Sequence, residues 1–77
     1  MNETLASLVV DVMGFDVSEV KSTLSREEEE RWDSLNHLRL ITAIEQTFST
    51  RLTMDEIENI VTLGDLDNLI ADKAASG

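Results

Sequence analysis

The chain has 77 residues, enough for one domain with one modest core but too few for a two-lobed enzyme with an enclosed cleft. Its formal charge of -10, from 16 acidic and 6 basic residues, repels the phosphates of nucleic acids and anionic lipids and favours protein partners with basic patches. The absence of cysteine excludes disulfides, thiolate metal sites and a cysteine nucleophile, and it suits the reducing cytosol.

The N-terminal segment predicts a helix and no export signal. Glu3 stands where a signal peptide needs a basic start, and no apolar run approaches the ~18 residues of a membrane span, so a soluble cytoplasmic protein is expected. Apolar residues follow the spacing of one helical face at Leu5, Leu8, Val9 and Val12. Gly14 is well placed to end this helix, which we expect over residues 3–13.

A long connecting segment follows, and its apolar residues have no helical spacing. Loops of this length are uncommon in so small a domain. We expect the segment to be fixed by a few apolar anchors, which are Phe15, Val17, Val20 and Leu24. The acidic run over residues 27–30 is too highly charged to bury and predicts a solvated patch.

A second helix is expected over residues 34–48. Positions at 100° intervals place one apolar stripe toward the core, formed by Leu40, Ile41, Ile44 and Phe48. Leu35 falls off this stripe and Leu38 lies between the core and solvent faces, while Arg39 lies on the solvent side. An apolar residue held out of the core at a helix start is a candidate contact for a partner protein.

Two further helices complete an all-α fold. Thr53 and Glu56 have the spacing of a capping box and predict a short helix over residues 53–59, with Ile57 and Ile60 as its buried pair. Thr62 can cap a last helix over residues 63–73, after which the tail beyond Ala74 is expected to fray. Because no proline, repeat or glycine-rich linker interrupts the chain, we expect one four-helix domain over residues 1–77. A monomer is expected.

The start of the second helix carries the chemistry. Unpaired backbone N–H groups and the positive end of the helix dipole favour an anion at Asp33-Ser34-Leu35, and a phosphodiester on the Ser34 hydroxyl would fit there. Asp33 can cap the helix, fix the direction of Ser34 and help hold the magnesium-bound phosphate of an incoming coenzyme A. Asp and Ser are also ordinary capping residues, so the local pattern leaves both interpretations open.

Over residues 32–70 the sequence resembles the acyl carrier protein family without a gap. The family pattern has Asp-Ser-Leu opening a helix, an apolar run ending near Glu-x-x-Phe, a short third helix and a last helix introduced by Thr-Val-Gly-Asp or similar. In this chain the pattern is carried by Asp33-Ser34-Leu35, then Leu38, Leu40, Ile41, Ala43, Ile44, Glu45 and Phe48, then Leu52 to Ile60, then Thr62-Leu63-Gly64-Asp65-Leu66. Before Glu30 the match is only architectural.

The resemblance implies a non-catalytic carrier with a 4'-phosphopantetheine arm, donated by coenzyme A, on Ser34. An acyl group would be held as a thioester on the arm, making the chain a phosphoprotein of fatty acid, polyketide or another specialised lipid biosynthesis. The implied partners are a phosphopantetheinyl transferase and the acyl-loading and acyl-processing enzymes. Candidate recognition residues are Leu35, Leu38, Arg39 and Glu45, and candidate acyl-pocket residues are Leu40, Ile44, Leu52, Ile57 and Ile60.

Departures from the usual fatty acid synthesis carrier favour a specialised role. Arg39 stands where many carriers place a glutamate, and its charge would repel a basic partner patch that matches an acidic helix. Trp32 before Asp-Ser resembles dedicated carriers of specialised pathways, although its size also suits it to anchor the end of the connecting segment against the bundle.

Other functions remain as alternatives or are disfavoured. An aminoacyl or peptidyl carrier usually shows Gly-Gly before the serine, which this chain lacks, and an unmodified acidic adaptor would use Ser34 only as a cap. His37 lies three residues after Ser34, but the sequence offers no orienting group or oxyanion hole for a hydrolase, so we expect a partly buried neutral imidazole. Asp65-Leu66-Asp67-Asn68 lacks the glycine and glutamate of a calcium loop, so no metal site is expected.

Overall fold

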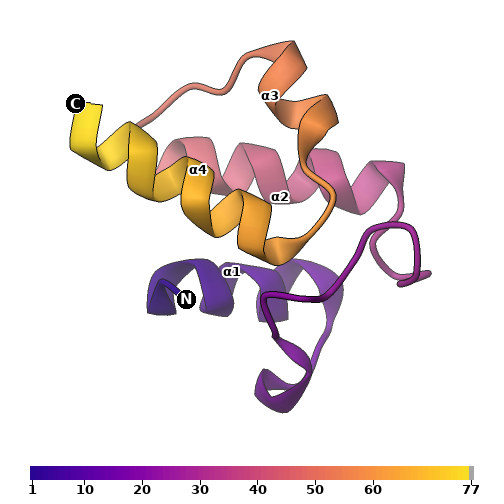
Figure 1. The fold of residues 1–77 in the computed structure, drawn as a ribbon. Helices are drawn as coiled ribbons and strands as arrows, with labels where there is room; N and C mark the ends of the chain where they lie inside the picture. Colours follow the sequence, from indigo (N-terminus) through magenta and orange to yellow (C-terminus); the bar gives the residue numbers. More distant parts are fainter. Residues whose placement is uncertain (77) are drawn as a thin grey trace.

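The computed structural model describes residues 1–76, and within these residues it contains four α-helices, one 3-10 helix and no strand. The elements are α1 (Glu3–Met13), η1 (Val17–Glu19), α2 (Ser34–Thr47), α3 (Met54–Asn59) and α4 (Leu63–Ser76). The long helix α1 runs opposite to α2 and α4, and short α3 lies beside the first half of α2 (Figure 1). The predicted all-α class is confirmed, and none of the described helices is long and apolar enough to cross a bilayer.

Local capping sets both ends of α1. The Asn2 side chain accepts hydrogen bonds from the N–H groups of Thr4 at 2.8 Å and Leu5 at 3.1 Å, which satisfies donors that a helix start leaves free. At the other end Gly14 adopts a left-handed conformation with φ of 71°, a conformation that glycine reaches without steric cost. The helix therefore ends where the sequence predicts.

Apolar faces of α1, α2 and α4 meet in one core. Leu40, Ile41 and Ile44 of the predicted α2 stripe are buried, whereas Phe48 is half-buried at the helix end. The core also takes in the aromatic residues Phe15 and Trp32. Its full set of buried apolar residues is Leu5, Val9, Met13, Phe15, Trp32, Leu40, Ile41, Ile44, Leu52, Ile60, Leu63, Leu66 and Ile70.

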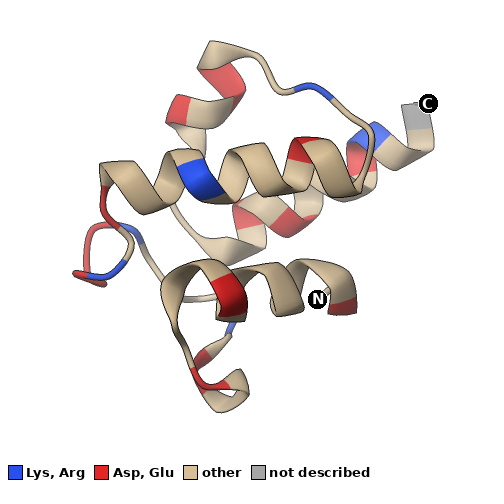
Figure 2. Ribbon diagram, turned by 180° about the vertical axis from the view of Figure 1, so that it is seen from behind, with Lys and Arg blue, Asp and Glu red and all other residues tan. Residues whose placement is uncertain are grey.

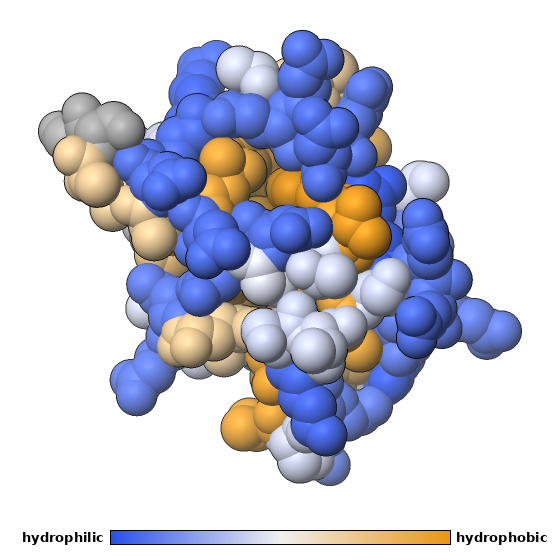
Figure 3. Space-filling model, viewed as in Figure 1, coloured by the Kyte–Doolittle hydropathy of each residue, from blue (hydrophilic) through white to orange (hydrophobic). Residues whose placement is uncertain are grey.

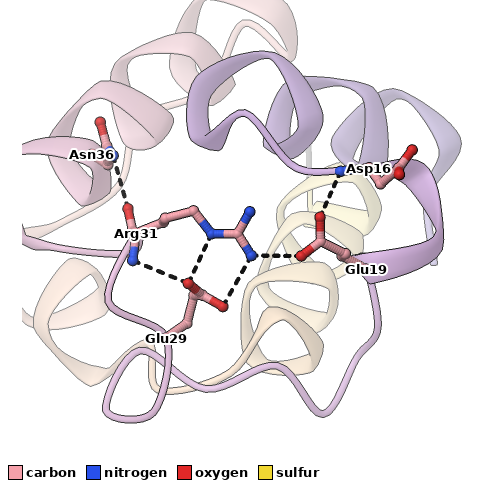
Figure 4. Close-up of polar contacts among 5 residues, drawn as sticks. All are labelled: Asp16, Glu19, Glu29, Arg31 and Asn36. Atoms are coloured by element: carbon pink, nitrogen blue, oxygen red, sulfur yellow. Dashed lines mark hydrogen bonds and ion pairs between the residues drawn. The ribbon is translucent and has the colours of Figure 1, made fainter.

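The connecting segment between α1 and α2 is fixed by polar contacts as well as by apolar anchors. Arg31 forms ion pairs with Glu19 and with Glu29, which lies 2.9 Å from its Nε, and the Arg31 carbonyl accepts a hydrogen bond from Asn36 at 2.8 Å (Figure 4). These bonds lower the pKa values of Glu19 and Glu29, because each carboxylate accepts directly from the guanidinium. The prediction that Val17 is an anchor is wrong. Val17 lies in η1 with 75% of its surface exposed, because η1 turns its side chain away from the core.

Helix boundaries from the end of α2 onward differ from the prediction at three places. Helix α3 begins at Met54, one residue late, because Thr53 is its N-cap. Helix α2 ends at Thr47, one residue early, because Phe48 caps it and Ser49 takes a positive φ of 51°. Helix α4 continues to Ser76 instead of ending at Lys73, since the alanines that follow Lys73 favour helix continuation. The helix thus extends past Ala74, and Gly77 lies outside the described residues.

The surface is predominantly acidic. Acidic residues lie on every helix and on the segment before α2, whereas basic residues are sparse (Figure 2). Apolar surface is gathered in small patches between hydrophilic side chains (Figure 3). The large apolar residues that are exposed are Met1, Val17, Leu35, Leu38, Met54 and Val61.

Candidate functional site

Ser34 is the first residue of α2, and its side chain is exposed. The Asp33 carboxylate accepts the N–H of Asn36 at 2.8 Å and its carbonyl accepts the N–H of His37 at 2.8 Å, so Asp33 is the helix cap that the sequence predicts. The remaining N–H groups of this first turn, on Ser34 and Leu35, face the end of the helix where its dipole is positive. The Ser34 hydroxyl is thus both accessible and placed where a negative charge is stabilised.

A hollow of about 440 Å³ lies beside Ser34. This is within the size range of pockets that hold small ligands. Its lining combines charged and apolar groups from three parts of the chain: Arg26, Glu27, Trp32, Asp33, Ser34, Glu58, Ile60 and Val61. The connecting segment, the start of α2 and the end of α3 therefore meet at the candidate site.

Arg26 joins two walls of this hollow. Its guanidinium donates to the carbonyl oxygen of Ile60 at 2.6 Å, and its backbone N–H donates to Val61 at 2.8 Å. Next to it, Ser25 and Thr62 form an isolated antiparallel bridge. The connecting segment is thereby clamped to the link between α3 and α4, a contact that the sequence pattern did not indicate.

Trp32, just before α2, and His37, in the first turns of α2, contact each other. The indole Nε1–H donates to His37 Nδ1 at 3.0 Å, and His37 Nε2 lies 2.9 Å from the carbonyl oxygen of Ile57 in α3. Only 2% of Trp32 and 4% of His37 is exposed, so Trp32 anchors the connecting segment, and His37 is buried rather than partly buried as expected. Burial is the main cause that lowers the pKa of His37, opposed by the Ile57 hydrogen bond and assisted by the charge of Arg26.

The outward face of α2 presents three of the four predicted recognition residues together. Leu35 is 59% and Leu38 is 56% exposed, and Arg39 beside them is also exposed. Met54 at the start of α3 is 68% exposed, and the sequence reasoning did not single it out. Its position at the first turn of a short helix, where a side chain need not face the core, is the signal that could have found it.

Glu45 and the candidate acyl-pocket residues lie in different surroundings. Glu45 is half-buried and accepts the backbone N–H of Leu52 at 3.0 Å, so it fixes the link after α2. Leu40 and Ile44 are fully buried in the core, Leu52 is buried, and Ile57 is half-buried. Of the five candidates, Ile60 lines the hollow beside Ser34.

Comparisons with known proteins agree on one family. A family model described as "Phosphopantetheine attachment site" matches residues 3–70. An "Acyl carrier protein" of Acidothermus cellulolyticus is 32% identical over 72 residues, which cover 94% of this chain and 86% of the relative. An "Acyl carrier protein" of Clostridium acetobutylicum is 31% identical over 68 residues, or 88% of each chain.

Proposed function

Because the chain belongs to the acyl carrier protein family, whose members hold a covalently attached 4'-phosphopantetheine, we propose that Ser34 is the attachment residue. The observation that carries this proposal is the exposed Ser34 hydroxyl at the first turn of α2, beside a hollow and inside the matched residues. The arm would hold acyl groups as thioesters, and the chain would deliver them to partner enzymes. The family match does not favour the peptidyl-carrier or adaptor alternatives.

The geometry suits the transfer of a phosphate-linked arm. The Ser34 oxygen would attack the phosphorus next to the pantetheine of coenzyme A, the phosphoanhydride bond would break, and adenosine 3',5'-bisphosphate would leave. A base of the transferase would take the hydroxyl proton. The N–H groups of Ser34 and Leu35 would stabilise the new phosphodiester, while Asp33, held by the N–H of Asn36, keeps the first turn in place.

Incubation with coenzyme A and a broad-specificity phosphopantetheinyl transferase, followed by intact mass measurement, tests the assignment. The wild-type chain should gain one arm and Ser34→Ala should gain none. Ser18→Ala is the matched control, because Ser18 is also exposed but lies in η1, away from the start of α2. A wild-type chain that keeps its unmodified mass while a control carrier is converted would support the adaptor alternative instead.

We further propose that the partners are enzymes of a specialised pathway. Arg39 places a positive charge next to the exposed Leu35 and Leu38, on a helix whose acid Glu45 is engaged with the backbone of Leu52. A basic partner surface would be repelled at Arg39. Arg39→Glu should therefore raise kcat/KM of fatty acid synthesis enzymes for the loaded carrier. Unchanged or lower kcat/KM would contradict this role of Arg39.

A further inference from the structure

The contact between Trp32 and His37 depends on one protonation state of the imidazole. His37 Nδ1 accepts the indole N–H at 3.0 Å, so this nitrogen carries no proton. The proton of the neutral ring is then on Nε2, which faces the Ile57 carbonyl oxygen at 2.9 Å. Both ring nitrogens have a partner, and the ring is buried, so water offers no replacement.

A second proton would break only one of these two bonds. Protonated Nδ1 would be a donor pointing at the indole donor, and two N–H groups at 3.0 Å repel each other. The bond from Nε2 to Ile57 would remain, since a cationic ring still donates there. Protonation therefore separates Trp32 from α2 without separating α2 from α3.

Trp32 is also one of the residues that line the hollow beside Ser34. We propose that the Trp32–His37 contact is a proton-controlled stopper, which keeps the hollow shallow while His37 is neutral and opens it toward the core when His37 is protonated. The part of this inference that concerns the arm rests on the proposed function of Ser34. The chemical class admitted by the open form is an apolar acyl chain, because Trp32 is itself part of the Leu-rich and Ile-rich core.

The charges around His37 agree with a neutral resting state. The positive charge of Arg26, on the connecting segment, disfavours a positive charge on the His37 ring. The acids that line the same hollow are Glu27, Asp33 and Glu58, and all three are exposed to solvent, which weakens their attraction for a buried cation. Burial and the positive charge of Arg26 therefore lower the pKa of His37 below its ordinary value of 6.5.

Intrinsic fluorescence of the unmodified chain tests the stopper directly, because Trp32 is the single tryptophan and the chain has no tyrosine. Between pH 7.5 and 5.0 the emission maximum should move to longer wavelength as the indole leaves its buried position. The ring nitrogen chemical shifts of His37 should titrate with the same midpoint and show the Nε2-protonated tautomer at pH 7.5. Most carboxylates titrate near pH 4, outside this window.

Two variants distinguish the effect of His37 titration on the emission from the effect of carboxylate titration. His37→Asn offers an oxygen near the position of Nδ1 but cannot titrate, so emission should stay at short wavelength across the window. His37→Gln reaches toward Ile57 and offers Trp32 no acceptor, so emission should stay at long wavelength. Circular dichroism checks that each variant folds. A wild-type chain with flat emission, a His37 that does not titrate above pH 5, or a wild-type-like transition in His37→Asn would overturn the proposal.

The loaded protein tests the consequence for cargo. Amide chemical shifts of the octanoyl form, compared with the arm alone, should change more around Ile60 at pH 5.5 than at pH 7.5, and this pH dependence should vanish in His37→Asn. Equal chemical-shift changes at the two pH values would refute the admission of the acyl chain. Whether the Trp32–His37 contact responds to protonation would still be decided by the fluorescence titration. Failure of Ser34 to accept the arm would refute the proposed function alone, since the titration uses the unmodified chain.

Discussion

Leu35 and Leu40 lie on the same helix, and truncating each one to alanine separates the partner face from the core. Leu40 has no exposed surface, so Leu40→Ala loses its burial and leaves a cavity, which costs about 2–5 kcal/mol of unfolding free energy. Leu35 is 59% exposed, so Leu35→Ala should change that free energy by only about 0.5 kcal/mol or less. In a domain of this size 1 kcal/mol corresponds to about 4–8 °C, so Leu40→Ala should lower Tm by more than about 8 °C.

The two substitutions should affect the rate of arm transfer in the opposite order, with the larger loss in Leu35→Ala. Leu35→Ala should lower kcat/KM of the phosphopantetheinyl transferase, because it removes an apolar contact beside Ser34. Urea unfolding followed by circular dichroism gives the stability, and intact mass against time gives the rate of arm transfer at a temperature where both variants are folded. A large loss of stability in Leu35→Ala, or an unchanged transfer rate, would refute the assignment of Leu35 to the partner face.

Three further predictions concern stability. Arg26→Ala should lower the unfolding free energy by about 1–2 kcal/mol, because it leaves the Ile60 carbonyl without its 2.6 Å donor; no change in urea unfolding would show that the clamp contributes nothing. Ser49→Gly should raise that free energy by about 0.5–1 kcal/mol, because glycine relieves the positive φ of 51° at some entropic cost, and a lower Tm would contradict this. The pKa of His37 is lower in the folded chain than the ordinary 6.5, so the unfolded chain binds more protons: the stability due to neutral His37 is complete above about pH 6.5 and is lost as pH falls toward the folded pKa. Urea midpoints measured between pH 7.5 and 5 should show this loss in the wild type but not in His37→Gln. An equal dependence of the urea midpoint on pH in the two chains would refute it.

The sequence alone was sufficient for features with local physical causes. The end of α1 at Gly14 follows from the left-handed conformation that glycine adopts there, and the start of α2 follows from the short side chain of Asp33. The exposure of Leu35 follows from the helical period, because a residue's angle around a helix is set by its number in the chain. Ser34 is a proposed site for the same reason: the helix start and the family pattern are both read along the chain.

Only the tertiary structure decided features that join distant segments. The Trp32–His37 contact is completed by Ile57, twenty residues beyond His37, and no periodicity predicts which carbonyl a buried imidazole will meet. Arg26 finds its acceptor at Ile60, 34 residues away, and Val17 is exposed because a 3-10 turn redirects it. The helices were set by interactions between near neighbours, whereas the hollow beside Ser34 exists because packing brings three separate segments together.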